Sequence, residues 1–129
     1  MRILGIDYGR AKVGIALGIN GFSEPLNVIR YKDTKILGDR IKLIIEKEKI
    51  EKIVVGISEG QMAQETKEFV KAIQPFIQST IILSDETLSS QDARKLSREA
   101  GIGRTKRRAM EDAYAASIML QNYLDSNTP

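Results

Sequence analysis

The chain has 129 residues, of which 42% are hydrophobic and 29% charged, and this composition suits one soluble globular domain over residues 1–129. It contains no cysteine and no histidine, which excludes a disulfide scaffold, a Cys nucleophile, a His base and thiolate or imidazole metal ligands. It lacks a signal-peptide pattern and an apolar run of transmembrane length, so we expect a cytoplasmic protein with no membrane partner.

The hydrophobic pattern predicts an α/β fold that begins with antiparallel strands and continues with strands joined by helices. Alternating or continuous apolar runs predict the strands, and apolar residues at helical spacing predict the helices. Strands separated by a helix must be parallel, so the sheet is mixed. Loops are expected at 21–25 and 101–108, and Pro75 should bend or end its helix early. The predicted strands are 2–7, 13–18, 27–31, 53–57 and 80–84, and the predicted helices are 34–49, 62–78, 89–98 and 111–124.

Acidic residues stand at three places where such a fold would gather ligands. Asp7 ends the first strand, Asp85 and Glu86 follow the fifth, and Asp112 lies in the first turn of the predicted last helix. Ligands of α/β sheets collect at the carboxyl ends of the strands. Carboxylates that converge there repel each other unless a cation neutralises them, and oxygen ligands favour a hard ion such as Mg²⁺ or Mn²⁺.

Each acid also has a purely structural interpretation. An Asp at the end of a strand can cap a turn, and Asp85 and Glu86 can cap the helix that follows them. Asp112 in a first helical turn is favoured by the helix dipole alone. The spacing of the acids therefore leaves both interpretations open.

Basic residues gather in one segment. Residues 94–108 carry seven Lys and Arg side chains and a single acid, a net charge of +6, whereas the remaining residues sum to −3. Such a segment predicts contacts with the phosphates of nucleic acid, or else is a solvated surface. Arg10 and Lys12, in the turn after Asp7, either steer a phosphate or pair with acids. The predicted nucleic-acid-binding residues are Arg10, Lys12, Arg104, Lys106, Arg107 and Arg108.

Four motifs in order, spread over essentially the whole chain, resemble those of the YqgF (RuvX-like) family. Members of this family are described as Holliday-junction resolvases and as nucleases of pre-16S ribosomal RNA. The motifs are Gly5-Ile6-Asp7-Tyr8-Gly9 with Val13-Gly14-Ile15-Ala16, Val54-Val55-Gly56, Asp85-Glu86-x-Leu88-Ser89-Ser90, and Glu111-Asp112-Ala113-x-Ala115-Ala116.

The resemblance implies a ribonuclease H-like fold, in which helices flank a five-stranded mixed sheet. It also implies that Asp7, Glu86 and Asp112 are the catalytic acids that bind Mg²⁺ or Mn²⁺, with Asp85 as a further candidate ligand. The implied substrate is structured nucleic acid, either pre-16S rRNA processed at its 5′ end or a Holliday junction in DNA. A homodimer is a candidate assembly, because junction resolvases often act as symmetric dimers.

The chain departs from the family pattern at three places. Thr87 stands where the family has Arg, Ala11 replaces one of two adjacent basic residues, and the loop after Gly56 is short. A non-catalytic nucleic-acid-binding relative is therefore one alternative. A nucleotide binder of the actin and sugar-kinase type is another, since its first hairpin also reads Asp-x-Gly, but that fold needs two such lobes and this chain has the length of one.

Overall fold

A computed structural model describes residues 1–57, 60–85 and 104–126, with the backbone alone at residue 85 and at 104–108. The predicted helix at 89–98 and residues 101–103 of the predicted loop lie outside these ranges. The described elements are β1 (Arg2–Asp7), β2 (Lys12–Ile19), β3 (Phe22–Arg30), α1 (Thr34–Glu48), β4 (Lys52–Ile57), α2 (Gln61–Ile73), the 3₁₀ turn η1 (Gln74–Phe76), β5 (Thr80–Asp85) and α4 (Arg104–Ser126).

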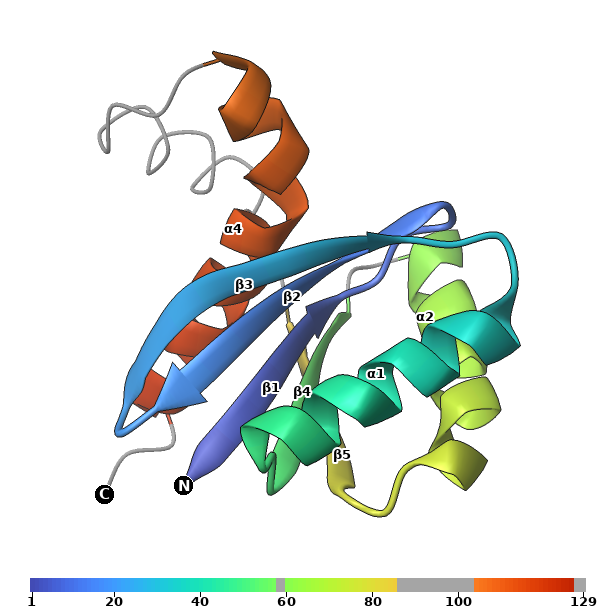
Figure 1. The fold of residues 1–129 in the computed structure, drawn as a ribbon, viewed down its shortest axis with the longest axis horizontal. Helices are drawn as coiled ribbons and strands as arrows, with labels where there is room; N and C mark the ends of the chain where they lie inside the picture. The colour runs from blue at the N-terminus through green and yellow to red at the C-terminus, as the bar shows by residue number, and fades with distance from the viewer. Residues whose placement is uncertain (58–59, 86–103, 127–129) are drawn as a thin grey trace.

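The strands form one five-stranded mixed sheet in the order β3-β2-β1-β4-β5. The first three strands are antiparallel, and β4 pairs parallel with both β1 and β5. Figure 1 shows α1 and α2 on one side of this sheet and α4 on the other. The predicted α/β architecture, with antiparallel hairpins first and parallel strands after them, is confirmed.

The two faces of the sheet pack in different ways, because side chains along a strand alternate between faces. Leu4 and Ile6 of β1 point into a large aliphatic core with α1 and α2. Ile3, on the opposite face, belongs to a smaller core with α4. The smaller core consists of Ile3, Ala16, Val54, Ala116, Met119 and Leu120. Helix α4 turns Ala113, Ala116 and Leu120 toward the sheet, and all three are buried.

Helix α1 has its predicted ends to within one residue, and α2 ends early near Pro75 as predicted, at Ile73 rather than at residue 78. The Asp33 side chain accepts a hydrogen bond from the Lys35 amide and so caps the start of α1. The helix ends at Glu48, and its C-cap residue, Lys49, has the left-handed conformation. Helix α2 ends at Ile73 and tightens into η1 around Pro75, as expected for a residue that cannot continue an α-helix. Among the described residues, no helix is long and apolar enough to cross a membrane.

The third strand begins earlier than predicted. Residues 21–25 were expected to form a loop, but β3 starts at Phe22. Asn20 and Gly21 both have positive φ, so they form a two-residue hairpin turn, for which Asn-Gly is a favoured sequence. Pro25 is tolerated because β3 is an edge strand and the register shifts beside it, leaving Leu26 as the extra residue of a bulge.

The last helix also begins earlier than predicted. Its backbone is helical from Arg104, whereas residues 104–108 were expected in a loop and the helix only from residue 111. Basic residues have good helix propensity but oppose the dipole of a helix N-terminus, which hides the start of this helix in the sequence. Asp112 therefore lies about two turns inside α4, and the helix dipole does not explain its presence there.

Glycines let α4 approach the sheet closely. A Cβ at Gly5 would lie 3.0 Å from the Leu120 side chain, and one at Gly18 would lie 3.2 Å from it. The contact is closest at Gly14, where a Cβ would lie 1.9 Å from the Asp112 carbonyl oxygen. The helix backbone therefore rests directly on β2, and a side chain at position 14 has no space.

Polar contacts fix α4 along the hairpin of β2 and β3. The Ser23 hydroxyl donates to the Ser117 carbonyl at 2.6 Å. The Gln121 side chain accepts from the Ser23 amide at 2.9 Å and donates to the Gly21 carbonyl at 3.0 Å. These contacts set the position of α4 along its axis, and with it the position of Asp112.

We expect Gly14→Ala to lower the free energy of unfolding by at least about 2 kcal/mol, because its Cβ would overlap the α4 backbone and neither backbone can yield cheaply. Urea unfolding followed by circular dichroism measures the change. The control is Gly38→Ala in α1, whose Cβ would meet Phe76 at an ordinary 3.5 Å. That variant should be neutral or slightly stabilised, since alanine is the better helix former. Equal stabilities for the two variants would contradict the close packing of α4.

Candidate active site

Asp7 lies in a row of residues that crosses the sheet where β1, β4 and β5 end. The residues in register are Gly14 on β2, Asp7 on β1, Gly56 on β4 and Ser84 on β5. Strand alternation places Asp7 on the same face as Ile3, the face that α4 covers. Glycine stands on both sides of Asp7, so no side chain of an adjacent strand crowds the carboxylate within this row.

Gly14 brings the second acid to the same place. It is the register partner of Asp7 across the β1–β2 pair, and it is also the point where the Asp112 backbone touches the sheet. Asp7 and Asp112, 105 positions apart in the sequence, therefore border the same glycine. Of the three predicted acidic ligands, these are the two that the structure brings together.

Asp112 is paired with a lysine at this site. Lys12 Nζ lies 3.0 Å from Asp112 Oδ2, with side-chain exposures of 37% and 31%. Oδ2 itself is buried, and the part of the chain that the structure describes gives it no hydrogen bond. The ammonium is thus within ion-pair distance but not in a hydrogen-bonding direction, so the carboxylate oxygen keeps unused acceptor capacity.

The other predicted acids are placed only in part. Asp85 ends β5 opposite Ile57, and β5 runs parallel to β1 with β4 between them. Glu86 lies outside the described residues. Within those residues no group of three acidic side chains forms a metal site. The predicted basic residues Arg104, Lys106, Arg107 and Arg108 lie in the first turns of α4, on the N-terminal side of Asp112.

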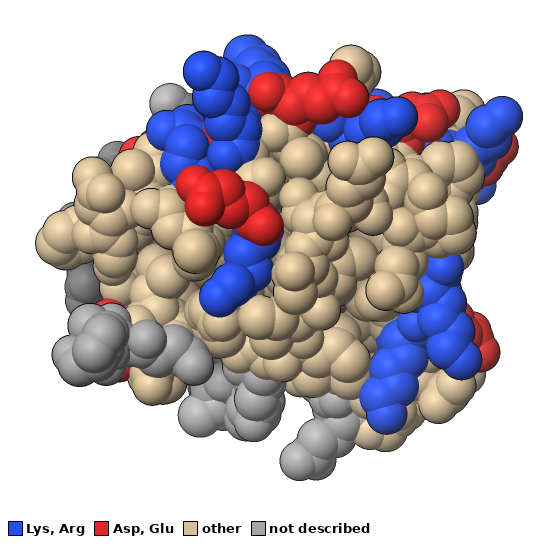
Figure 2. Space-filling view, turned by 90° about the horizontal axis from the view of Figure 1, so that it is seen from below, with Lys and Arg blue, Asp and Glu red and all other residues tan. Residues whose placement is uncertain are grey.

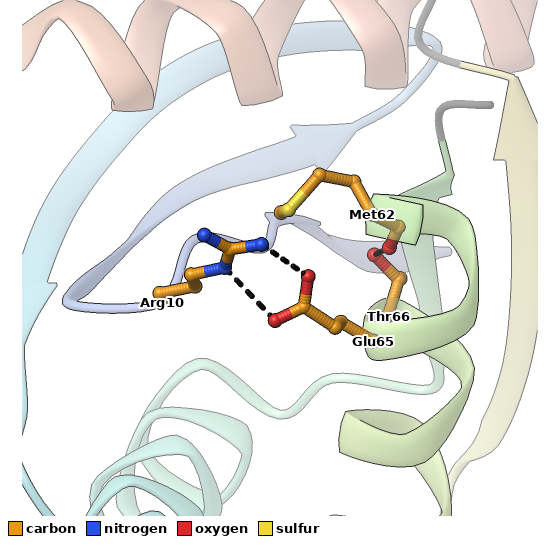
Figure 3. A network of polar contacts seen from close by, with 4 residues as sticks. All are labelled: Arg10, Met62, Glu65 and Thr66. Atoms are coloured by element: carbon orange, nitrogen blue, oxygen red, sulfur yellow. Dashed lines mark hydrogen bonds and ion pairs between the residues drawn. The ribbon is translucent and has the colours of Figure 1, made fainter. Parts of the chain in front are cut away.

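The predicted phosphate-binding residues Arg10 and Lys12 both pair with acids. Arg10 donates from Nε and Nη2 to the two carboxylate oxygens of Glu65 on α2, at 2.9 and 2.7 Å. Figure 3 shows this bidentate pair, next to the hydrogen bond from the Thr66 hydroxyl to the Met62 carbonyl. Hydrogen bonding between the two side chains raises the pKa of Arg10 and lowers that of Glu65. Arg10 Nη1 takes no part in the pair and still has its two protons to donate.

Two tyrosines hold the turn between β1 and β2, and the sequence analysis did not predict either contact. The Tyr8 ring stacks on Phe69 of α2 with 4.7 Å between ring centroids. The Tyr31 hydroxyl donates to the Gly9 carbonyl at 2.6 Å, and burial raises the pKa of Tyr31. Glu65 and Phe69 are four residues apart, so they share one face of α2. This spacing is the sequence signal that could have indicated that both contact the β1–β2 turn.

The opposite end of the sheet has a different surface. Figure 2 looks from below Figure 1, toward the side where β1 and β5 begin. Most of the surface in this view is uncharged, and basic and acidic side chains alternate along its upper edge. This side, as far as the chain is described, presents no continuous basic patch to a polyanion.

Comparison with known proteins identifies the family and the fold of this chain. The sequence matches the family RuvX, described as Holliday junction resolvase, over residues 1–126. Curated relatives named "Putative pre-16S rRNA nuclease" include proteins of Halothermothrix orenii and Thermoanaerobacter pseudethanolicus. The first is 34% identical over 97% of this chain and 95% of the relative. The second is 35% identical over 98% of this chain and 97% of the relative.

Solved structures share the fold at low sequence identity. RuvC of T. thermophilus in complex with a Holliday junction substrate has a TM-score of 0.69 at 14% identity, over 99% of this chain and 97% of that chain. The fowlpox virus resolvase in complex with Holliday junction DNA has a TM-score of 0.64 at 14% identity, over 100% of both chains. These likenesses confirm the predicted ribonuclease H-like fold. The family match and the curated relatives show that the chain belongs to the RuvX (YqgF) family.

Proposed function

We propose that this chain is a divalent-metal-dependent nuclease that hydrolyses phosphodiester bonds in structured nucleic acid. The observation that carries the proposal is the convergence of Asp7 and Asp112 on Gly14 at the end of β1. Two carboxylates held in one place repel each other unless a cation lies near them. Asp112 lies beyond the first turn of α4, where the helix dipole does not account for an acid.

The donor atoms fit a hard cation. Asp112 Oδ2 is buried without a hydrogen bond among the described residues, and such an oxygen is suited to coordinate a metal. Mg²⁺ and Mn²⁺ prefer oxygen ligands of this kind. We propose Asp7, Glu86 and Asp112 as the ligands, with Asp85 as a further candidate, because Glu86 directly follows the strand that ends at Asp85.

The protein's own contribution is to hold charge in position. A bound divalent cation would activate water and stabilise the leaving oxygen of the phosphodiester. Asp7 is fixed by pairing on both sides of β1, and Asp112 by the contact of α4 with Gly14. The backbones of both acids are therefore held in position before substrate arrives, which limits the reorganisation that the reaction needs. Arg10, Lys12 and the basic start of α4 are proposed to contact the phosphates beside this site.

Precursor ribosomal RNA is the first substrate to test, because the relatives that share about a third of this sequence carry that name. A four-way DNA junction is the second, because the family is described by that activity. Contacts to phosphates through Lys and Arg carry little sequence information, so recognition should depend mainly on the shape of the nucleic acid.

We expect Asp7→Asn to reduce the cleavage rate by at least about 100-fold. Loss of a residue that only hydrogen-bonds to a metal ligand already lowers activity or metal affinity about 10- to 100-fold, and Asp7 is proposed as a ligand itself. Cleavage of precursor rRNA and of a four-way junction is measured with Mg²⁺, with Mn²⁺ and with EDTA. Binding to nucleic acid, measured in EDTA, should persist or strengthen, since the substitution removes a negative charge.

The matched control is Asp39→Asn, the same change at an exposed position of α1. Its cleavage rate should equal that of the unmodified protein. Cleavage that continues in excess EDTA, or that is undiminished by Asp7→Asn, would contradict the proposed metal site. Binding without cleavage of either substrate in any metal would favour the non-catalytic alternative.

We expect the combined change of Arg104, Lys106, Arg107 and Arg108 to Gln to weaken binding and to make its salt dependence shallower. Each phosphate contact contributes a slope of about −0.9 on a log–log plot for duplex DNA, so loss of four contacts would flatten the slope by up to about 3–4. Fluorescence anisotropy at several salt concentrations measures both quantities.

A control with the same loss of charge comes from α1, where Lys35, Arg40, Lys42 and Lys47 are all exposed. Changing these four to Gln should leave the slope nearly unchanged, because α1 lies on the other side of the sheet from α4 (Figure 1). Equal slopes for the two quadruple variants would show that the start of α4 is an ordinary solvated surface.

A further inference from the structure

Lys12 holds a position at the proposed metal site that a phosphate-binding role alone does not explain. Its ammonium lies 3.0 Å from Asp112 Oδ2, on the carboxylate oxygen that is buried and has no hydrogen bond within the described residues. A cation placed on a proposed metal ligand supplies part of the charge that the metal would supply. The same oxygen cannot serve both cations fully.

We infer that Lys12 is an internal counter-ion that neutralises Asp112 in the metal-free protein and competes with the divalent cation for it. The inference rests on the proposed function, because it concerns the same acidic ligands. It assigns Lys12 as a positioning residue that sets the metal affinity. Loading of the metal would then require the ammonium to leave Oδ2.

The structure indicates which partner can move. The Asp112 backbone rests on Gly14 with no space between them, so the backbone that carries this carboxylate is held against the sheet. The backbone of the β1–β2 turn is held by the hydrogen bond from Tyr31 to Gly9 and by the pairing of Arg10 with Glu65. The Lys12 side chain, with its four-carbon stem, is the flexible member of the pair. Its ammonium makes no hydrogen bond to Oδ2, so it can leave without breaking one.

Charge determines the direction of the effect. A divalent cation bound by Asp112 would lie a few ångströms from the Lys12 ammonium and would be repelled by it. The phosphates of nucleic acid offer that ammonium another partner, so substrate should draw Lys12 away and strengthen metal binding. Linkage requires the reverse as well, namely that the metal strengthens binding of nucleic acid. The site would therefore bind the divalent cation more tightly when nucleic acid is present.

The test is Mn²⁺ binding by isothermal titration calorimetry, with Mn²⁺ alone and no nucleic acid. We expect Lys12→Met to bind Mn²⁺ roughly tenfold more tightly than the unmodified protein, because both the repulsion and the competition are gone. Lys12→Arg, which keeps the charge, should bind as the unmodified protein does. Lys42→Met on α1 is the control for overall charge and should have no effect.

Thermal unfolding gives a second readout that does not depend on catalysis. Without metal, Lys12→Met should unfold at a lower temperature, since Asp112 loses its partner, and Mn²⁺ should raise its melting temperature more than that of the unmodified protein. Lys12→Gln, which retains a polar donor, is measured in parallel and should show the same preference for metal. If neither variant folds without Mn²⁺ but both fold with it, the ammonium and the metal are interchangeable, as the inference requires.

The outcomes separate this inference from the proposed function. If Mn²⁺ binds to the unmodified protein but not to Asp7→Asn, the metal site stands. If Lys12→Met then binds Mn²⁺ equally or more weakly, the counter-ion role is wrong and Lys12 only orients Asp112. If Mn²⁺ binds to no variant, the proposed function fails and the inference fails with it.

Discussion

The structure of the site depends on one steric contact, between the backbone of α4 and the missing side chain of Gly14. At this contact a helix that follows the last strand touches a strand from the first hairpin. Because a Cβ at Gly14 would lie 1.9 Å from the Asp112 carbonyl oxygen, the helix can dock in this register only over glycine. The contact brings the Asp112 backbone to the register partner of Asp7. It also brings Asp112 within reach of Lys12, two residues before Gly14 on the same strand.

The sheet could be predicted because its signals are local and mutually consistent. Continuous β-branched residues mark β4, and Pro75 marks the end of α2, so both agree with the observed elements. Pro25 hides the start of β3 in the sequence, because proline is rare inside strands. The positive φ of Asn20 and Gly21 shows the hairpin turn that precedes it. The start of α4 was missed because its first turns are basic, opposite to the charge preference of a helix N-terminus.

The candidate site was predictable in its acids but not in its pairings. Asp7 and Asp112 stood out because a carboxylate at the end of a strand and another in an alanine-rich helix need a reason to be there. Their convergence depends on the register of α4 over the sheet, which no local pattern encodes. The partners Lys12–Asp112 and Arg10–Glu65 join segments 100 and 55 residues apart, so they follow from the fold rather than from spacing. The first hairpin alone suits a kinase equally well, and it is the match over residues 1–126 that favours a nuclease.

The bulge in β3 has a consequence for how copies of this chain can associate. The strand forms one edge of the sheet, and it carries Pro25 and an extra residue, Leu26, at the point where its register shifts. An irregular, twisted edge is a poor template for another strand, and natural proteins use such features against edge-to-edge aggregation. We therefore do not expect a symmetric dimer of this protein to continue the sheet through β3.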